Sequence, residues 1–324
     1  MPAIITHDFF GQDVYKVFSK LIGESRNEHH AFLLGCQGPD PLFYSALVPR
    51  LRRFTNLGST MHSQKTSELL VAFKQSLYLL EPDEQTIGRA YLFGFLCHYA
   101  LDSCVHPLVY WYENQLCTAG VEGLDEKDRS EVHAVIECEI DEMVLFRKKQ
   151  VTVAKFSPAT EILRGSDFVL SIVSKMYSYV SLVTYGIHSP ENMFTSCLKS
   201  FRRTERVFHS RSGIKRKLLG DLEEIFRPHS FVRSMSPRAL KITESNFDNH
   251  ERATWVNPFT GEETRADFWE LCTAAFAKVQ RAFVLIDRET FGPETARVIT
   301  KNLNFSGEST VAVLTIEDAD ENYA

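Results

Sequence analysis

The sequence predicts an all-α fold, a multi-helix globular bundle, and three observations indicate it. Apolar residues recur at three- and four-residue spacing through most of the 324-residue chain, which is the pattern of helices with one buried face. Sustained alternation of apolar and polar residues, the pattern of a half-buried strand, is nearly absent, and 311–316 (VAVLTI) is one short strand-like run. A hydrophobic content of 44% supplies enough apolar surface for a substantial core.

The helical period is carried by segments along the whole chain. In order, they are 11–22, 64–80, 86–117, 128–147, 160–184, 191–209 and 265–288. Loops are expected where glycine, proline and polar residues cluster. These places are 35–41, 81–83 and 228–263.

We expect one catalytic domain over residues 1–290 and a C-terminal extension over 291–324 that ends in an acidic tail. Within the domain, 245–265 is a candidate lid, because long irregular segments in compact domains often serve in binding. This segment contains Trp255, and packing of that side chain into the core is the alternative.

Composition and charge restrict the class of protein. The net charge of −6 gives no general reason to bind nucleic acid or an anionic membrane surface. The N-terminus has no basic stretch followed by an apolar run, so no secretory signal is expected. The seven cysteines are odd in number and form no C-x-x-C pair, which is typical of a reduced cytoplasmic protein.

Residues 89–111 (RAYLFGFLCHYALDSCVHPLVYW) are mostly apolar and about as long as the ~20 residues that a membrane span requires. His98, Asp102 and His106 lie inside this segment, and an aspartate near the centre of a bilayer is costly. We therefore expect a buried core helix. No second segment of this kind is expected, and hence no integral membrane segment.

The polar residues of this helix share one face. His98, Asp102 and His106 stand at i, i+4 and i+8, and residues four apart lie one above the other on a helix. The three residues cover about 12 Å along the axis, which suits two neighbouring metal ions better than one. Pro107 follows and is expected to disturb the helix at His106.

A second helix supplies His133 and Glu137, again at i and i+4. Metal sites in helical folds are built from such pairs on facing helices. A single pair of this kind is more often a local hydrogen bond, but buried carboxylates in apolar helices require cations. Imidazole and carboxylate ligands without thiolate suit zinc best, and iron or manganese also fit this chemistry. The sequence thus predicts a metal site.

The pattern H-x-x-x-D-x-x-x-H-P followed by H-x-x-x-E resembles the zinc-dependent phospholipase C family, which is related to the single-strand-specific zinc nucleases. Three further landmarks resemble that family in the same order along the chain. Gly38-Pro-Asp40-Pro resembles its loop aspartate, Met61-His62 its next histidine ligand, and His7 its early histidine. The resemblance covers roughly residues 1–185.

The resemblance implies which residues hold zinc. The ligands of one zinc would be Asp40, His62, His98 and Asp102. Those of a second zinc would be His106, His133 and Glu137. In secreted members a third zinc is held by an N-terminal tryptophan, the early histidine and the shared aspartate. Here His7 and Asp102 are present, but the amine of Met1 or of a processed Pro2 would have to replace the tryptophan. Two or three zinc ions are therefore expected.

The resemblance also implies the reaction, which is hydrolysis of a phosphodiester, with phospholipid as substrate. Asp40 is assigned the catalytic role of orienting or deprotonating the attacking water. Two Zn²⁺ and three ligand carboxylates leave a surplus of about +1, which favours an anionic phosphoryl group. The nuclease relatives make a nucleotide or oligonucleotide the alternative substrate.

The alternative to an enzyme is a binding module that holds metal for stability and has no catalytic activity. The number of candidate ligands argues against it, because a structural zinc site needs a closed set of four. Residues 202–217 carry seven Lys/Arg against one Glu, which indicates either a solvated helix face or contact with a membrane surface. The histidines without partners at metal spacing are expected to be structural or superficial: His29, His30, His188 and His209.

Overall fold

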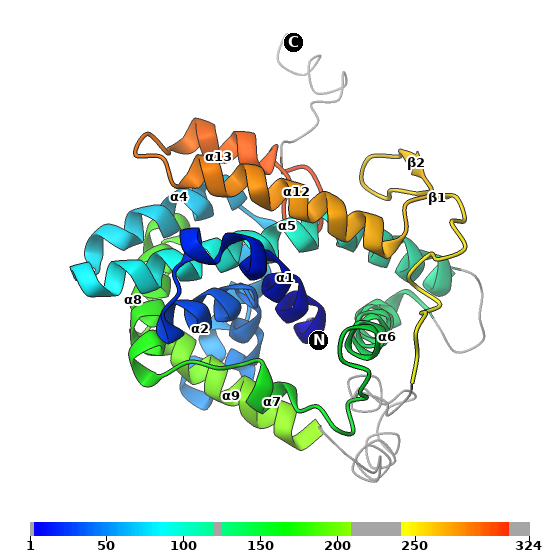
Figure 1. Cartoon of the computed structure of the whole chain (residues 1–324), viewed down its shortest axis with the longest axis horizontal. Coiled ribbons are helices and arrows are strands. Elements are labelled where there is room, and N and C mark those ends of the chain that lie inside the picture. The colour runs from blue at the N-terminus through cyan, green and yellow to red at the C-terminus, as the bar shows by residue number, and fades with distance from the viewer. Residues whose placement is uncertain (1–2, 119–124, 209–240, 311–324) are drawn as a thin grey trace, which may run out of the picture.

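The computed structural model describes residues 3–118, 125–208 and 241–310, and shows a bundle of helices (Figure 1). Within these residues, strand structure is confined to a small hairpin and one isolated bridge between Leu303 and Ser309. The predicted all-α class is confirmed. The strand-like run 311–316 lies outside the described residues.

The elements follow one another closely, and η denotes a 3-10 helix. The first part of the chain contains α1 (Ile4–Ile22), α2 (Arg26–Gly35), η1 (Asp40–Leu47), η2 (Pro49–Phe54), α3 (Leu57–Ser63), α4 (Thr66–Ser76) and η3 (Leu77–Leu79). The middle contains α5 (Pro82–Thr118), η4 (Glu126–Asp128), α6 (Arg129–Lys149), α7 (Pro158–Glu161), α8 (Asp167–Tyr185) and α9 (Met193–Phe208). The last part contains β1 (Trp255–Val256), β2 (Glu263–Thr264), α12 (Phe268–Ile286) and α13 (Pro293–Thr300).

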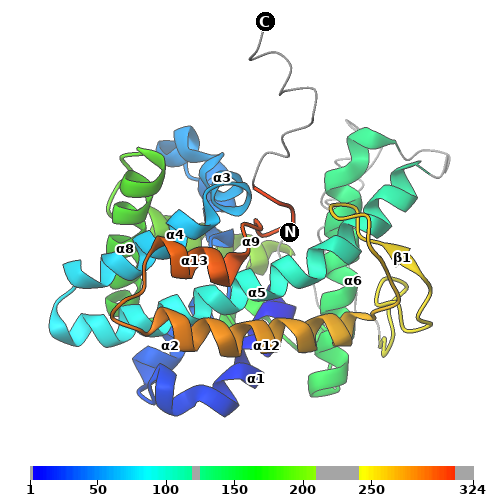
Figure 2. The ribbon, with the colours of Figure 1, turned by 90° about the horizontal axis from the view of Figure 1, so that it is seen from above.

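Helix α5 forms the axis of the bundle. It is 37 residues long and buries apolar side chains around most of its circumference, which is the pattern of a helix enclosed on all sides. Helices α1, α2, α6, α8 and α12 pack against it. In Figures 1 and 2, α12 runs alongside α5, and α6 lies near its C-terminal half. The helix continues through Pro107, so the expected disturbance at His106 does not end it.

Several boundaries differ from the predicted ones. The segment 11–22 is the second half of α1, which starts at Ile4, and 160–184 is divided between α7 and α8. Helix α2 was not predicted, although Ser25 and Glu28 form a capping box there and S-x-x-E is a readable helix start. Helix α13 was also missed. The basic segment 202–217 is described only as far as residue 208.

The candidate lid 245–265 contains the hairpin, in which Trp255 pairs with Thr264 and Val256 with Glu263. The Trp255 side chain is buried, and its Nε1 donates to the Ala266 carbonyl at 3.0 Å, so it packs as the alternative prediction states. Phe259 in the turn meets the ring of Tyr110 edge to face, with ring centroids 5.4 Å apart. The lid role itself stays a prediction.

Among the described residues, two helices, α5 and α8, are long and apolar enough to cross a membrane by length and composition. In α5, 89% of the apolar window is buried inside the fold, in agreement with a core helix. The expectation that no second such segment exists was wrong. In α8 the apolar window is 56% buried, because this helix packs one side against α4 and α9.

The described part of the C-terminal segment belongs to the packed fold. Helix α13 packs against α4 and α12, and the chain then returns to the centre of the molecule. There the Phe305 amide donates to the carbonyl of His62 at 3.0 Å, and the Phe305 side chain is fully buried. The boundary predicted at residue 290 stays a prediction, but residues 303–306 reach the candidate site.

Candidate metal centre

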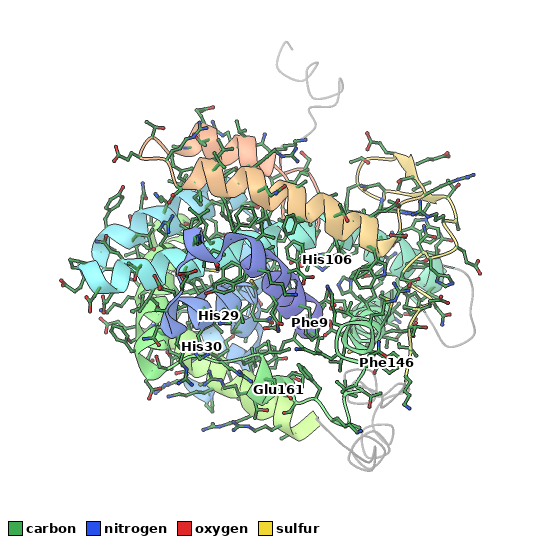
Figure 3. The ribbon with its side chains drawn as sticks, in the orientation of Figure 1. Phe9, His29, His30, His106, Phe146 and Glu161 are labelled. Atoms are coloured by element: carbon green, nitrogen blue, oxygen red, sulfur yellow. The ribbon has the colours of Figure 1, made fainter. Side chains whose placement is uncertain are left out.

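A cavity of about 670 Å³ lies where the N-terminus of α1, η1, α3, α5 and α6 meet. Seven of the eight predicted ligands line it: His7, Asp40, His62, Asp102, His106, His133 and Glu137. The eighth, His98, is fully buried beside them. Figure 3 shows His106 in the interior of the bundle, whereas His29 and His30 lie on α2, away from it. The structure thus brings together side chains that are up to 130 positions apart (His7 to Glu137).

The loop before η1 places Asp40 by close contact with α5. Gly38 has a φ of +50°, and a Cβ at this position would lie 2.1 Å from the His98 ring, so only glycine fits. The Gly38 carbonyl accepts hydrogen bonds from the hydroxyls of Tyr91 and Tyr177, at 3.2 and 2.9 Å. Asp40, at the start of η1, is 2% exposed. A rigid, buried loop therefore holds this carboxylate.

Four histidines share one orientation. The Nδ1 atoms of His62, His98 and His106 lie 2.8, 3.2 and 3.1 Å from the carbonyl oxygens of Gly58, Cys36 and Phe305. The Nδ1 of His133 lies 3.0 Å from a carboxylate oxygen of Glu113. Donation from Nδ1 leaves a lone pair on each Nε2 and fixes the direction of the ring, as metal-ligating histidines require.

The first donor set consists of the four residues that the resemblance implies for one zinc, and their ligand atoms lie close together. The Nε2 atom of His62 is 3.0 Å from Asp40 Oδ1 and 3.4 Å from the Nε2 of His98. The His98 Nε2 is 3.2 Å from Asp102 Oδ2 and 3.7 Å from Asp40 Oδ1. Ligand atoms roughly 2.0–2.1 Å from a tetrahedral zinc lie about 3.3 Å from one another. These spacings are those of such a set.

The second set lies one turn along α5. The Glu137 Oε1 atom is 3.4 Å from His106 Nε2 and 3.5 Å from His133 Nε2. Asp102 stands between the two sets, because its Oδ2 faces His98 and its Oδ1 is 3.9 Å from His106 Nε2. The i, i+4 spacing on α5 and α6 thus produces two adjacent donor groups.

His7 joins the site from the first turns of α1. Its Nε2 is 3.0 Å from Asp102 Oδ1, and its donor atom also lies within 4.8 Å of those of Asp40 and His98. The start of α1 is held by Asp141 of α6, whose carboxylate accepts from the Ile5 and Thr6 amides at 3.0 and 2.8 Å. A carboxylate at a helix N-terminus is favourable, and here it fixes the position of His7. The N-terminal amine lies outside the described residues.

The charges of the cluster are strongly coupled. Burial alone would raise the pKa of the Asp102 carboxyl, but the surrounding histidines, His98 foremost, hold that pKa well below its usual range. Burial likewise opposes ionisation of Glu137, and His133 and His106 hold its pKa low. Burial lowers the pKa of His98 to about 4 despite Asp102 beside it. Asp102 and Glu137 are therefore ionised in a buried site, where imidazolium groups or a bound cation balance their charge.

An unsatisfied acceptor supports a metal or water ligand. The Oδ2 atom of Asp40 is buried and has no hydrogen-bond partner among the described residues. An orphaned buried acceptor is costly, and its neighbours are the two imidazoles that approach Oδ1 of the same carboxylate. The oriented imidazoles, the ionised carboxylates and this free oxygen together fit divalent zinc.

Glu113 and Phe305 contribute to the site and were not predicted. Glu113 is 4% exposed and contacts both His133 and the Arg129 guanidinium, the latter at 3.3 Å. It follows His106 by seven residues, two turns along the same helix face, so the spacing could have identified it. Phe305 contributes its backbone carbonyl to His106, and a backbone acceptor leaves no signal in the sequence.

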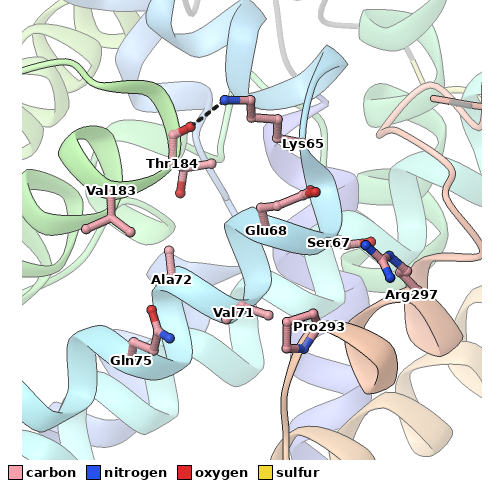
Figure 4. Close-up of a pocket in the computed structure, with 10 residues that line it drawn as sticks. All are labelled: Lys65, Ser67, Glu68, Val71, Ala72, Gln75, Val183, Thr184, Pro293 and Arg297. Carbon is pink, nitrogen blue, oxygen red and sulfur yellow. Dashed lines mark hydrogen bonds between the residues drawn. The ribbon is translucent and has the colours of Figure 1, made fainter.

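A different cavity, of about 410 Å³, lies between α4, α8 and α13 and is drawn in Figure 4. Lys65 reaches across one end of it and donates to the Thr184 carbonyl at 2.9 Å. Glu68 is the carboxylate among its described lining residues, which include no histidine or cysteine. This cavity therefore lacks the donors of a metal centre.

Residues 6–177 match the family of proteins described as zinc dependent phospholipase C. The match spans more than half of the chain and includes every predicted ligand, and the chain belongs to this family. No protein of curated function and no solved structure matches the chain at a significant level. The family implies a zinc-dependent hydrolase of the phospholipase C type, and the donor groups described above are of a kind that holds metal.

Proposed function

We propose that this protein hydrolyses the phosphodiester bond of a phospholipid, with Asp40 as the base and the two donor sets as zinc ligands. One observation carries the proposal: the donor atoms form the floor of a cavity of about 670 Å³ that can admit a substrate. A structural zinc site is closed by four ligands. Here seven candidate ligands line an accessible space.

The cavity wall favours a lipid over a nucleic acid. Beside the donors, the wall is built of Phe43, Tyr44, Leu47, Tyr110 and Phe305. No lysine or arginine is found among its described lining residues, whereas single-stranded nucleic acid is held by a positively charged groove that follows its backbone. An oligonucleotide is therefore the second candidate, supported by the aromatic rings on which bases could stack.

The reaction follows from the positions of the side chains. Zinc, when bound, would polarise the phosphoryl group and lower the pKa of a coordinated water. Asp40, with Oδ2 free of hydrogen-bond partners among the described residues, accepts the proton of the attacking water. The water oxygen forms a bond to phosphorus, the bond from phosphorus to the glycerol oxygen breaks, and that oxygen takes up a proton. The products are diacylglycerol and a phosphorylated headgroup.

We also propose that the protein works in a reducing, cytoplasmic environment. All seven cysteines are free thiols, and burial raises the pKa of two of them, Cys138 and Cys197, to about 12. Thiols with such pKa values are unreactive at neutral pH.

The test uses zinc-loaded protein and a water-soluble, short-chain phosphatidylcholine. We expect release of phosphocholine that stops on chelation and returns with zinc, and little cleavage of carboxyl esters or phosphomonoesters. Digestion of oligonucleotides with no cleavage of the lipid would favour the second candidate. Zinc-loaded protein that cleaves neither would leave a metal-stabilised binding module as the function.

A further inference from the structure

The helix that carries Asp40 leads from the metal centre to the protein surface. A 3-10 helix has three residues per turn, so Asp40, Phe43 and Ala46 follow one another along one side of η1. Exposure rises along this side, from 2% for Asp40 to 40% for Phe43, and Leu47 beside Ala46 is 60% exposed. All four line the cavity. An apolar wall therefore runs about 12 Å from the donors to the cavity mouth.

The next element, η2, packs against η1 and is positively charged. In η2, Arg50, Arg52 and Arg53 are all exposed, and none has an ion-pair partner among the described residues. Arg50 donates to Ser196 Oγ of α9 at 2.9 Å. From residue 41 to 67 the sequence contains no Asp or Glu, although the whole chain has a net charge of −6. The chain around η1 and η2 is thus locally basic in an acidic protein. In Figure 2 the part of the chain just before α3, in blue, contains η1 and η2.

We propose that the rim formed by the cavity mouth and the exposed arginines of η2 docks the protein on an anionic phospholipid bilayer. The docking surface consists of Phe43, Ala46, Leu47, Arg50, Arg52 and Arg53. Phe43 and Leu47 enter the boundary between headgroups and acyl chains, and the arginines contact lipid phosphates. The proposal rests on the proposed function, since it names how the phospholipid substrate reaches the cavity.

The combination of side chains favours a bilayer as the partner. Exposed apolar residues beside arginines are the composition of segments that lie in the membrane interface. Lysine and arginine residues near an anionic leaflet each strengthen binding about fivefold. Because the apolar wall is continuous with the cavity, a lipid can move from the bilayer towards the donors with its acyl chains against Phe43 and Leu47. Its phosphate is then at the level of Asp40.

The apolar wall also contacts the candidate metal centre directly. The Phe43 ring stacks on that of His62, with ring centroids 5.2 Å apart. The same side chain therefore packs against a metal-ligand candidate on one side and is exposed at the rim on the other. Docking at this rim places the cavity mouth, rather than another face of the protein, against the lipid surface.

The test measures how much full-length protein sediments with vesicles of equal parts phosphatidylcholine and phosphatidylglycerol. The measurement is made with zinc present and again after zinc has been removed by a chelator. Arg52→Gln with Arg53→Gln should weaken binding about 25-fold, from about fivefold per arginine. Leu47→Ser should weaken it about tenfold through lost apolar burial. The matched controls are Leu79→Ser, at 61% exposure, and Arg281→Gln with Arg288→Gln, both exposed. These controls should bind as the unsubstituted protein does, with unchanged melting temperatures.

Binding should also fall with salt and be weaker on pure phosphatidylcholine. The proposed docking surface would be wrong if wild-type protein bound neither the mixed nor the pure phosphatidylcholine vesicles. It would also be wrong if the variants of the docking surface bound as well as their controls. Turnover of the soluble short-chain lipid is measured separately. Vesicle binding without turnover would refute the proposed function and leave docking intact, whereas turnover without vesicle binding would refute docking alone.

Discussion

Replacing Asp40 with asparagine separates a catalytic base from a simple ligand. In the structure, Asp40 Oδ1 lies 3.0 Å from His62 Nε2 and 3.7 Å from His98 Nε2, whereas Oδ2 is buried without a hydrogen-bond partner among the described residues. Asparagine keeps an oxygen towards the imidazoles. It removes the negative charge and the proton acceptor at Oδ2.

The expected loss follows from these two roles. General-base catalysis contributes about 10²–10⁴-fold in rate, which corresponds to about 2.7–5.4 kcal/mol of transition-state stabilisation. The remaining donors of the first set, His62, His98 and Asp102, still lie within 4.8 Å of one another. We therefore expect Asp40→Asn to keep most of its zinc and its fold while its turnover falls by that factor.

The assay measures zinc content, melting temperature and the rate on a soluble phosphodiester with one preparation. Asp248→Asn is the matched control, because Asp248 is 1% exposed and binds His250 and the Ser245 amide outside the cavity. That variant should lose stability but keep its rate per folded molecule. An unchanged rate in Asp40→Asn would refute the assigned role. Loss of zinc together with activity would make Asp40 chiefly a ligand.

Three further predictions concern residues around the cluster. Glu113→Gln should weaken zinc binding about 10–100-fold, because the carboxylate that orients His133 is lost; competition with a chelator measures this. Phe305→Ala should destabilise the fold by about 3–5 kcal/mol in urea unfolding, because the side chain is fully buried against His62 and His98. Burial, with Asp141 nearby, raises the pKa of Glu205 from 4.5 to about 8. The folded protein then holds a proton that the unfolded chain releases, so stability should fall as the pH rises from 4.5 to 8. Glu205→Gln should flatten this dependence in thermal melts.

Each of these has a clear opposing result. Unchanged zinc affinity in Glu113→Gln would show that the 3.0 Å contact does not orient His133. A Phe305→Ala variant as stable as the wild type would mean that the C-terminal segment does not pack at the site. If the stability of wild type and of Glu205→Gln changed with pH in the same way, Glu205 would not be the protonated carboxyl that causes the dependence.

The clustering of the candidate ligands could be predicted because the chemistry and the spacing coincide in the sequence. His98, Asp102 and His106 share one face of a helix that is otherwise apolar, and buried polar residues at that period have few explanations other than a site. His133 and Glu137 repeat the pattern on a second helix. The all-α class was predicted from the three- and four-residue spacing of apolar residues along the chain. Residues 6–177, which match the family, contain all of these.

Other parts could not be predicted, for physical reasons. Phe305 acts on His106 through its backbone carbonyl, which every residue type possesses, and it meets the site only through tertiary packing. Helix α13 has eight residues and is too short for its period to be distinct. The hairpin at Trp255 has two-residue strands, below the length at which alternation can be recognised. In η1, the period of three rather than 3.6 conceals the row formed by Asp40, Phe43 and Ala46.

The central claim is that the cluster around Asp102 binds zinc and that this binding holds the core together. The most direct measurement is the zinc content of purified protein, combined with its melting temperature before and after chelation. We expect two or three zinc ions per chain and a lower melting temperature once they are removed, because ions bound by the folded state stabilise it. Asp102→Asn and His133→Ala should lose zinc and stability. Protein that contains no zinc, takes none up and melts at the same temperature with chelator would contradict the claim.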